Sequence, residues 1–418
     1  MSPLRDMLPL AASLFDGLAK LGHDGVGITR DSYGVGETAA IEYLAGQAAE
    51  YGLKTSRDGA GNMMIDLPDY TAGPAIWIGS HLDSVPQGGN YDGAAGVIAG
   101  LLCLVALRQS NQAPPRPVRV AALRGEESAW YGKAYMGSSA LFGKLDEHDL
   151  ALRRRNGSGS LADALAALGA DLDNIRAGKP LVDIGDIAAY LELHIEQGPV
   201  MVARNLPTAV VTGIRGNIRH GNIVCLGEAG HSGAVPRWLR HDTVFAMAEL
   251  ISRLDEHWRI LLERGLDLVI TSGIVGTPPE EHAISRIPGR VAFSFEVRSQ
   301  SNDTLEAFYH LMRTEAETIA RSRGVRFEFD RRIYSAPARM DDAIVRRLLD
   351  ISARQGLPVE TLPSGAGHDA AIFANAGIPS GMIFVRNANG SHNPQEAMEL
   401  ADFIAGAGLL YDAVSTKA

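Results

Sequence analysis

The sequence predicts an α/β protein in which a domain built on a mainly parallel sheet is interrupted by a smaller α+β domain. Three observations lead to this prediction. A chain of 418 residues has room for two domains of roughly 150 residues or more. The first half alternates apolar strand-like and helix-like runs, as βα units around a parallel sheet do. From about Gly213 the order becomes strand, helix, strand, strand, helix, strand, and the α/β pattern resumes after Arg331.

The first domain is expected to hold residues 1–211 and 332–418. It opens with an amphipathic helix over Met1–Leu21. The elements expected before the insert are the helix Thr38–Tyr51, the strand Ala75–Gly79, the helix Ala94–Leu107 and the strands Val118–Leu123 and Ala188–Leu193. Those expected after it are the helix Asp342–Gln355, a short helix following Gly367, the strand Gly381–Val385 and a last helix from Glu396. The basic and Gly/Ser-rich stretch Arg153–Ser160 predicts a solvated loop.

The inserted domain is expected over residues 212–331. Its predicted strands are Asn222–Leu226, Leu266–Ile274, Arg290–Arg298 and Val325–Asp330, and its predicted helices are Asp242–Arg264 and Asn302–Ser322. Two long amphipathic helices among alternating strands predict a four-stranded sheet that carries both helices on one face.

Composition excludes several classes of protein. Hydrophobic residues make up 46% and charged residues 21% of the chain, which excludes intrinsic disorder as the main state. A net charge of −10 disfavours nucleic acid and anionic membranes as partners. The longest apolar run, Ala94–Leu107, has about 14 residues, fewer than the ~20 that span a bilayer. Two cysteines, Cys103 and Cys225, are too few for a disulfide framework, so we expect a soluble protein of the reducing cytoplasm.

Five segments place His, Asp or Glu side chains where apolar elements begin or end. They are Ser80–Ser84, Asn90–Val97, Arg124–Ser128, Glu192–Gly198 and Gly390–Pro394. Neutral imidazole and carboxylate groups are ligands for zinc and similar ions. Each segment alone has an ordinary explanation, such as a polar turn for His81 or a helix cap for Asp92. Together their side chains would suffice for two metal ions that share a carboxylate.

Two of these segments hold paired acids. Asp83 follows His81 by two residues and could hold one ring nitrogen while the other binds a metal. Glu126 and Glu127 are adjacent, and two such carboxylates at the end of a buried strand repel unless a cation or a proton lies between them. One of the two could bind metal while the other serves as a base.

The order of the motifs HxD, NxDGxxGV, GEE, ELHIEQGP, GEAGHSGxxP, SGAGHDA and SHNP resembles the hydantoinase/carbamoylase family of di-metal amidohydrolases. This family includes N-carbamoyl-L-amino-acid hydrolases, allantoate amidohydrolases and β-ureidopropionases, within the aminoacylase and metallo-carboxypeptidase superfamily. The match starts near Gly27–Arg30 and covers nearly the whole chain. ELHIEQGP is the motif most specific to this branch. The resemblance implies a metallopeptidase-like catalytic domain and an insert that serves as a lid and dimerisation domain.

The resemblance also implies roles for particular residues. The implied metal ligands are His81, Asp92, Glu127, His194 and His392, with Asp92 bridging two divalent ions per subunit. Zinc is the first choice of metal, with manganese, cobalt and nickel as alternatives. Glu126 would be the general base and Asp83 the partner of His81. His231 would stabilise the oxyanion from the other subunit of a homodimer, and Gln197 and Arg298 would bind substrate, the arginine through a carboxylate.

The sequence departs from the family pattern at two places. Ser285 stands where the family usually has an Asn before the Ile-Pro-Gly turn, and Trp130 lies where Gly-Ser-Arg-Phe usually follows the paired glutamates. Both positions line the substrate pocket in relatives, so Ser285 and Trp130 are candidate substrate-binding residues. His368 is a further candidate, which could either orient substrate or hold its loop.

These residues lead to one main function and two alternatives. The main prediction is hydrolysis of a non-peptide C–N bond in a ureido or amide group of a small carboxylate-bearing molecule. An aminoacylase-like amidase acting on an N-acyl or aromatic amino-acid amide is the alternative that Trp130 favours. A catalytically silent binding protein is the third, but an intact base and five intact ligands argue against it.

Overall fold

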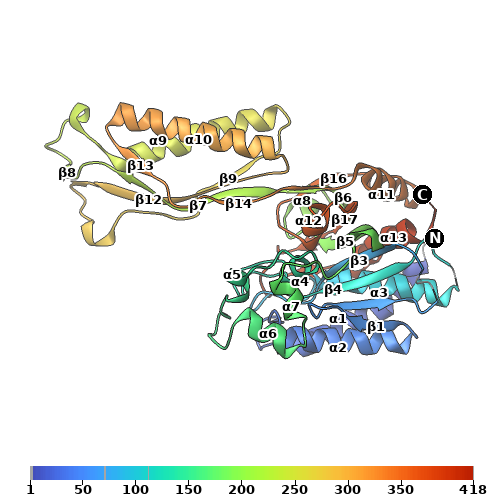
Figure 1. Cartoon of the computed structure of the whole chain (residues 1–418). Helices are drawn as coiled ribbons and strands as arrows, with labels where there is room; N and C mark the ends of the chain where they lie inside the picture. Colours follow the sequence, from blue (N-terminus) through green and yellow to red (C-terminus); the bar gives the residue numbers. More distant parts are fainter. Residues whose placement is uncertain (1–2, 70–71, 112, 418) are drawn as a thin grey trace. The chain divides into compact units, whose positions relative to one another are not determined.

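The computed structural model describes residues 3–69, 72–111 and 113–417. The chain divides into two compact units, which we describe separately. Unit 1 comprises Met1–Gly213 and Arg339–Ala418, and unit 2 comprises Ile214–Ala338 (Figure 1).

A nine-stranded sheet forms the centre of unit 1. Its strands are β1 (Lys54–Arg57), β2 (Met63–Asp66), β3 (Ala75–His81), β4 (Val118–Leu123), β5 (Ile187–Ile195), β6 (Thr208–Ile214), β15 (Ala338–Arg339), β16 (Thr361–Ser364) and β17 (Ser380–Val385). The four central strands β4, β3, β5 and β17 run parallel, whereas β1, β2 and β6 pair antiparallel with their neighbours. The prediction of a mainly parallel sheet therefore holds for the centre, but the sheet as a whole is mixed. β1 and β2 are antiparallel because only a short turn joins them.

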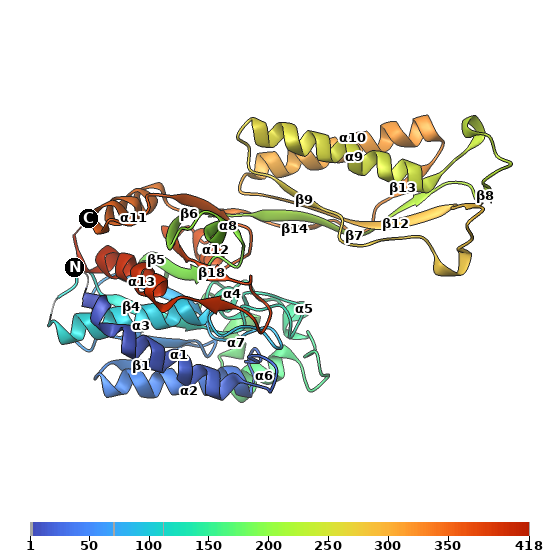
Figure 2. The ribbon, with the colours of Figure 1, turned by 180° about the vertical axis from the view of Figure 1, so that it is seen from behind.

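Helices cover the two faces of this sheet. One apolar core contains residues of α1 (Leu8–Gly22), α2 (Val35–Glu50), α3 (Ala94–Gln109), α11 (Asp342–Gln355) and α13 (Leu400–Ser415). Residues 94–107 of α3 are all buried, which explains why its sequence is apolar on every side. α1 and α13 come from opposite ends of the chain and lie side by side, with the rings of Phe15 and Phe403 5.1 Å apart (Figures 1 and 2).

The other face carries α12 (Asp369–Ala374), whose Phe373 ring stacks on Tyr190 of β5 at 3.8 Å. Shorter helices complete unit 1: α4 (Met136–Leu141), α5 (Glu147–Leu150), α6 (Leu161–Ala167), α7 (Leu172–Arg176), α8 (Val200–Ala203), and the 3₁₀ turns η1 (Pro3–Met7) and η2 (Ile184–Asp186). The last helix begins at Leu400 and not at Glu396, because the side chain of Glu396 is engaged elsewhere, as described below.

Unit 2 contains a six-stranded sheet in which a central pair of strands is flanked on each side by two short strands, one after the other. Its elements are β7 (Gly216–Leu226), β9 (Val269–Thr271), β10 (Val275–Gly276), β12 (Arg290–Ser299), β13 (Arg326–Glu328), β14 (Ile333–Ser335), α9 (Thr243–Glu263) and α10 (Asn302–Arg323). β7 and β12 form the central pair, β9 and β10 follow one another along the free edge of β12, and β13 and β14 do so along β7. Unit 2 extends beyond the expected end at Arg331 because β14 still pairs with β7.

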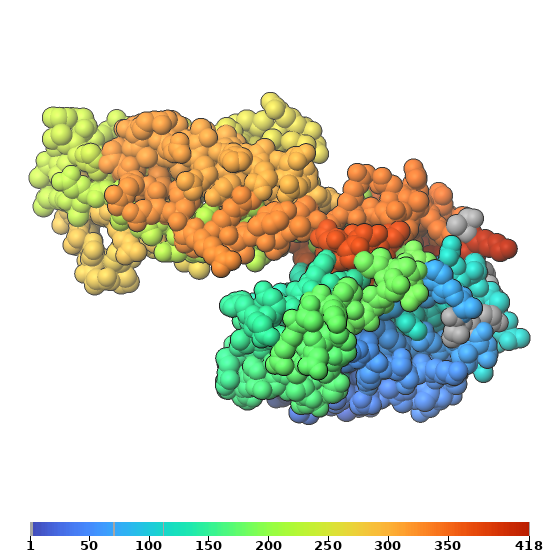
Figure 3. Space-filling model, viewed as in Figure 1, coloured from blue at the N-terminus to red at the C-terminus, as the bar shows by residue number. Residues whose placement is uncertain are grey.

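The core of unit 2 lies between this sheet and its two long helices. Burial alternates along β12, so one face of the strand is covered and the other carries half-buried side chains. Side chains of α10 form much of the visible face of this unit (Figure 3). A separate two-stranded ribbon pairs β8 (Gly230–His231) with β11 (Arg286–Ile287), and two 3₁₀ turns, η3 (Arg237–Leu239) and η4 (Pro279–Glu281), complete the unit. No helix in the described part of the chain has an apolar stretch long enough to cross a membrane.

Candidate metal centre

The parallel strands of unit 1 bring the predicted metal ligands to one edge of the sheet. β3 ends at His81, β5 carries His194 as its penultimate residue, and β4 ends just before the segment with Glu127. Because these strands are parallel and adjacent, their carboxyl ends meet at the same edge. Asp92 lies just before α3. His392 lies between β18 (Asn387–Ala388) and β19 (Ala397–Met398), an antiparallel pair.

Asp92 lies between two groups of potential ligands. Its Oδ1 atom is 3.6 Å from Nε2 of His81 and 3.2 Å from Nε2 of His194. Its Oδ2 atom is 3.4 Å from Nε2 of His392, which in turn is 3.2 Å from Oε1 of Glu127. The donor atoms within each group lie within 4.8 Å of one another. Each carboxylate oxygen of Asp92 therefore faces its own set of donors, as a bridging ligand requires.

The chemistry of this donor set fits divalent cations. Asp83, Asp92, Glu126 and Glu127 are all at least nine-tenths buried around the imidazole of His81. Such a concentration of buried carboxylates is unfavourable unless cations neutralise it. Nε2 of His194 is buried and has no hydrogen-bond partner among the described residues. A metal ion at each group would satisfy both conditions, and mixed N/O donors suit zinc and its neighbours in the first transition row.

The backbone at Gly93 packs against the imidazole ring of His81, which brings His81 close to Asp92. Gly93, which precedes α3, has φ = +65°, and a Cβ atom there would lie 2.5 Å from the ring of His81. Only glycine satisfies both the left-handed backbone and this contact.

Asp83 contacts both His81 and the segment that carries Glu126 and Glu127. Its Oδ1 atom is 3.2 Å from Nδ1 of His81, whose Nε2 atom points to Asp92. The same carboxylate accepts the backbone N–H groups of Glu126 and Glu127, each at 3.1 Å, and the hydroxyl of Ser32. Asp83 thus fixes the orientation of one ligand and the place of the two glutamates.

Glu126 lies beside the ligands without joining either group. Its Oε2 atom is 3.9 Å from Nε2 of His81. Burial raises the pKa of its carboxyl well above the usual range; His81 opposes this rise, and Glu127 adds to it. The carboxyl of Glu127 also has a raised pKa, first because of burial. Of the two acids, Glu127 contacts His392 and Glu126 does not, so the structure separates the pair that the sequence left open.

Three further side chains contact Asp92 or its backbone. Gln197, which has φ = 62°, donates from Nε2 to Oδ2 of Asp92 at 2.8 Å. Its Oε1 atom is buried and has no partner among the described residues. Ser391 donates to the same Oδ2 atom, and Glu396 accepts the backbone N–H groups of Tyr91 and Asp92 at 2.8 and 3.2 Å.

His368 lies behind His194. Its ring centroid is 4.3 Å from that of His194, it is almost completely buried, and its Nε2 atom is 2.8 Å from the hydroxyl of Ser364. Burial lowers the pKa of its imidazole well below the usual range. Of its two predicted roles, holding the loop agrees with these contacts.

Trp130 is half-buried next to the HxD segment. Its indole N–H donates to the backbone oxygen of Ser84 at 2.7 Å, which fixes the plane of the ring. Its backbone oxygen accepts the N–H of Arg155, so the same residue also anchors the basic stretch 153–160.

The other three predicted residues lie in unit 2. His231 and Ser285 are both exposed and neighbouring: His231 pairs with Arg286 across the β8–β11 ribbon, and Ser232 donates to the backbone oxygen of Ser285 at 2.7 Å. Arg298 is on β12, with its Nε atom 3.0 Å from Oε2 of Glu296. His231 and Arg298 are at opposite ends of unit 2, because β11 precedes the start of β12 and Arg298 is next to its end.

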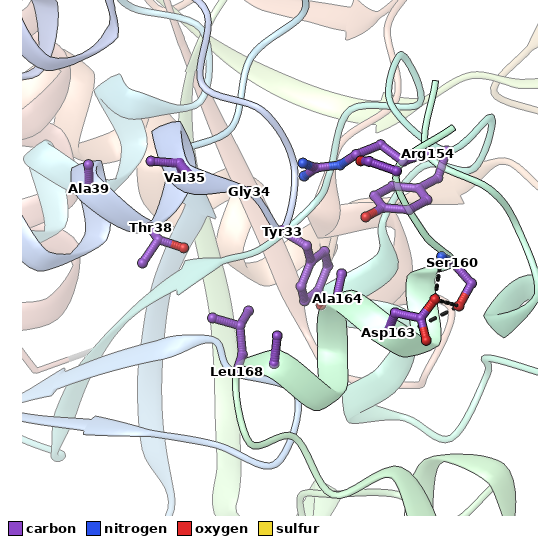
Figure 4. A pocket seen from close by; sticks show the side chains of 13 residues that line it. Tyr33, Gly34, Val35, Thr38, Ala39, Arg154, Ser160, Asp163, Ala164 and Leu168 are labelled. Carbon is purple, nitrogen blue, oxygen red and sulfur yellow. Dashed lines mark hydrogen bonds between the residues drawn. The ribbon is translucent and has the colours of Figure 1, made fainter. Parts of the chain in front are cut away.

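The basic stretch 153–160 is mostly exposed, as predicted, but Arg154 within it is half-buried. Arg154 forms an ion pair with Asp31 at 3.0 Å and donates to the backbone oxygen of Ser32 at 2.7 Å. With α6 and the start of α2 it closes a pocket of about 580 Å³, in which Tyr33, Thr38 and Asp163 are further lining residues (Figure 4). The pocket contains none of the predicted site residues.

Sequence reasoning did not single out several residues that support the centre. They are Ser32, Glu37, Asn62, Arg124, Ser391 and Glu396. Glu396 had a usable signal, since it follows the SHNP motif by two residues. Ser391 and Arg124 lie within segments that the sequence analysis noted, whereas Ser32, Glu37 and Asn62 are single polar residues whose partners in the centre are distant in the sequence.

Comparison with known proteins gives consistent matches over the length of the chain. Residues 77–416 match the model of peptidase family M20/M25/M40. The chain is 35% identical to an N-carbamoyl-L-amino acid amidohydrolase of Geobacillus stearothermophilus, over 96% of this chain and 97% of that protein. It is 32% identical to an allantoate amidohydrolase of Escherichia coli, over 93% of both chains.

Solved structures agree with these matches. A crystal structure of an amidase of the hydantoinase/carbamoylase family from Burkholderia multivorans matches with a TM-score of 0.87 and 26% identity, over 98% of this chain and 97% of that chain. The resemblance inferred from the motifs is confirmed. The chain belongs to peptidase family M20/M25/M40 and, within it, to the hydantoinase/carbamoylase amidohydrolases.

Proposed function

We propose that this protein is a di-metal amidohydrolase that cleaves a non-peptide C–N bond in the carbamoyl or ureido group of a small carboxylate-bearing substrate. The observation that carries the proposal is the position of Asp92, whose two oxygens face separate groups of imidazole and carboxylate donors. The names of the relatives, carbamoyl-amino-acid and allantoate amidohydrolases, support the substrate class.

Five residues would hold the metals. His81 and His194 would share one ion with Asp92, and Glu127 and His392 would share the other. When bound, such cations polarise the substrate carbonyl and lower the pKa of water. Zinc is the first choice, with manganese, cobalt and nickel as alternatives, because mixed N/O donors accept each of these ions.

Glu126 would move the proton. It accepts one proton from the attacking water and returns it to the leaving nitrogen, so that one carboxyl serves as base and then as acid. Its contacts support this role, because Asp83 holds its backbone N–H while its side chain remains outside both ligand groups.

Gln197 would orient the scissile group. Its Oε1 atom is buried and finds no hydrogen-bond partner in the described part of the chain, while its Nε2 atom donates to Asp92. A buried acceptor without a hydrogen bond is unfavourable, so a hydrogen-bond donor of the substrate would stabilise the complex by pairing with this oxygen. A ureido group offers N–H donors for this position, whereas the substrate carboxylate would bind Arg298 through charge-assisted hydrogen bonds.

Unit 1 would be the catalytic domain and unit 2 the lid and dimerisation domain, and the length of β12 supports a shared active site. β12 has 10 residues, so its ends are roughly 30 Å apart at ~3.4 Å per residue. His231 is beyond one end and Arg298 is next to the other. No small substrate can touch both in one chain. If both act on one substrate, they come from different subunits of a homodimer, with His231 donating to the oxyanion.

A paired assay tests the substrate class. N-carbamoyl-L-phenylalanine and N-acetyl-L-phenylalanine differ only in the group on the amide carbon, so their kcat/KM values report carbamoyl against acyl preference. We expect the carbamoyl compound to be the better substrate. A higher kcat/KM for the acetyl compound would favour the aminoacylase-like alternative, for which the fixed indole of Trp130 offers an apolar wall.

The buried free thiols of Cys103 and Cys225 suit a cytoplasmic enzyme.

A further inference from the structure

The segment that carries Glu126 is held by side chains rather than by a strand. Four consecutive backbone N–H groups, those of residues 124–127, each donate to a buried side-chain oxygen. The acceptors are Oδ1 of Asn62 for Arg124, Oε1 of Glu37 for Gly125, and the two oxygens of Asp83 for Glu126 and Glu127, at 2.8, 2.8, 3.1 and 3.1 Å. The carbonyl oxygens of residues 124–126 accept N–H groups of residues 137, 136 and 135.

Among these acceptors, Glu37 lies on a helix that carries none of the candidate metal ligands. It lies in the first turn of α2 and is completely buried. Its Oε2 atom accepts the backbone N–H of Tyr33 and Nη1 of Arg124, both at 2.7 Å, while Oε1 accepts Gly125. One carboxylate therefore joins α2 to the turn directly before the proposed base.

Arg124 completes the link. Its guanidinium is buried against Glu37, and its Nε atom donates to the backbone oxygen of Gly61 at 2.8 Å. Gly125, between Arg124 and Glu126, has φ = +63°, and a Cβ atom there would lie 2.8 Å from the ring of Tyr33. The turn is thus held by packing as well as by hydrogen bonds.

We propose that Glu37, paired with Arg124, is a positioning residue that sets the place of the Glu126 carboxylate. The inference rests on the proposed function, in which Glu126 transfers the proton. Asp83 cannot do this alone, because it fixes the N–H groups of Glu126 and Glu127 but not the turn that leads into them. A displacement of about 1 Å at a reacting group can lower a rate by about 100-fold, so loss of this link should be visible in kcat.

An ion pair on β4 itself, which is less buried than the Glu37–Arg124 pair, provides a control. Arg119 donates from Nε to Asp66 of β2 at 2.8 Å, near the opposite end of the strand that leads to Arg124. The double variant Glu37→Gln/Arg124→Met is called the test pair, and the double variant Asp66→Asn/Arg119→Met is called the control pair. Both changes neutralise an arginine–carboxylate pair, one within β4 and one directly after it, and only the first touches the turn before Glu126. Glu37→Asp is a third variant, which keeps a charge opposite Arg124 but is one methylene too short to reach all its donors.

The measurements are kcat and KM for N-carbamoyl-L-phenylalanine at saturating metal, bound metal per chain, and melting temperature. We expect the test pair and Glu37→Asp to lower kcat about 10- to 100-fold while KM and metal content stay within about threefold of the parent. The control pair should leave kcat within about twofold, whatever its melting temperature. An equal fall in kcat for test and control pairs would overturn the proposal, since it would reflect general destabilisation.

A double-mutant cycle distinguishes action through Glu126 from a direct effect. The test pair is combined with Glu126→Gln, and the residual turnover is followed with enzyme in excess of substrate. If Glu37 acts through Glu126, adding the test changes should leave the residual rate within about twofold of the rate of Glu126→Gln alone. If the test changes lower the rate of Glu126→Gln as much as they lower the rate of the wild-type enzyme, the inference is overturned but the proposed function is left intact. Wild-type kcat in Glu126→Gln itself would instead contradict the proposed function.

Discussion

At the residue scale, two adjacent glutamates have different surroundings. Glu127 reaches His392 at 3.2 Å and lies within the second group of ligands. Glu126 instead lies 3.9 Å from Nε2 of His81, outside both groups. Two identical residues that are adjacent in the chain therefore have different contacts and can take separate roles.

Substitution of these glutamates should separate proton transfer from metal binding. Glu126→Gln should lower kcat by about 10²–10⁴-fold, because the amide cannot accept the proton, and should leave metal content unchanged. Glu127→Gln should lose bound metal, because it removes a charged ligand. Metal analysis of both purified variants, together with kcat, checks this. Equal loss of metal in the two variants would contradict the assignment.

The sequence was informative where residues form motifs and uninformative where they act singly. His81, Asp92 and His194 could be singled out because they belong to motifs whose joint order resembles a known family, and the structure brings their side chains together. Glu37 could not, since nothing in its helix distinguishes it from an exposed acid. Its partners Gly125 and Arg124 are almost 90 positions away, and only the folded chain brings them together.

At the element scale, the β18–β19 pair brings His392 to Asp92. The approach is fixed by Glu396, which is buried and accepts the N–H groups of Tyr91 and Asp92 as well as the hydroxyl of Ser391. A segment near the end of the chain is thereby tied to the turn that precedes α3.

Removal of this tie should weaken metal binding. Glu396→Ala leaves two backbone donors without an acceptor and frees the turn that carries Asp92, so metal affinity should fall about 10- to 100-fold. Glu399→Ala is the matched control, because Glu399 is exposed and its side chain makes no capping bond to α13. Competition of the metal-free variants with a chromophoric chelator measures both affinities. Equal weakening in the two variants would argue against the role of Glu396.

Elements with a clear pattern of apolar residues were predictable, and elements of four or five residues were not. The strand Val118–Leu123 and the helix Asp342–Gln355 have the predicted bounds, because their periodic patterns are strong. The strand expected over Leu266–Ile274 is shorter than predicted: only β9 (Val269–Thr271) forms within it, and β10 begins at Val275, where the chain pairs with a different stretch of β12. α5 and α7 have four or five residues each, too few for a helical period to show.

At the scale of the whole molecule, the proposed dimer gives a test that depends on two chains. His231→Ala and Glu126→Gln should each be nearly inactive as homodimers. After subunit exchange, half of the dimers are mixed and one of their two sites has both residues intact. The mixture should therefore recover about a quarter of wild-type activity. Activity assays before and after exchange, with the mixed dimer shown by native mass spectrometry, check this expectation.

A double variant serves as the control for exchange. When Glu126→Gln/His231→Ala is mixed with Glu126→Gln, no site has an intact base, so activity should stay at the level of the parents. If the first mixture also stays inactive although mixed dimers are present, His231 does not act across the subunits.

The order of the ligands along the chain has a consequence for biosynthesis. His81, Asp92 and His194 leave the ribosome well before His392, which follows His81 by about 300 residues, and α13 must still pack against α1. A nascent chain could therefore gather the first ligand group early but not the second. A translation product that stops short of the last strands would carry an acidic, half-built centre, and such a product could capture metal without gaining activity.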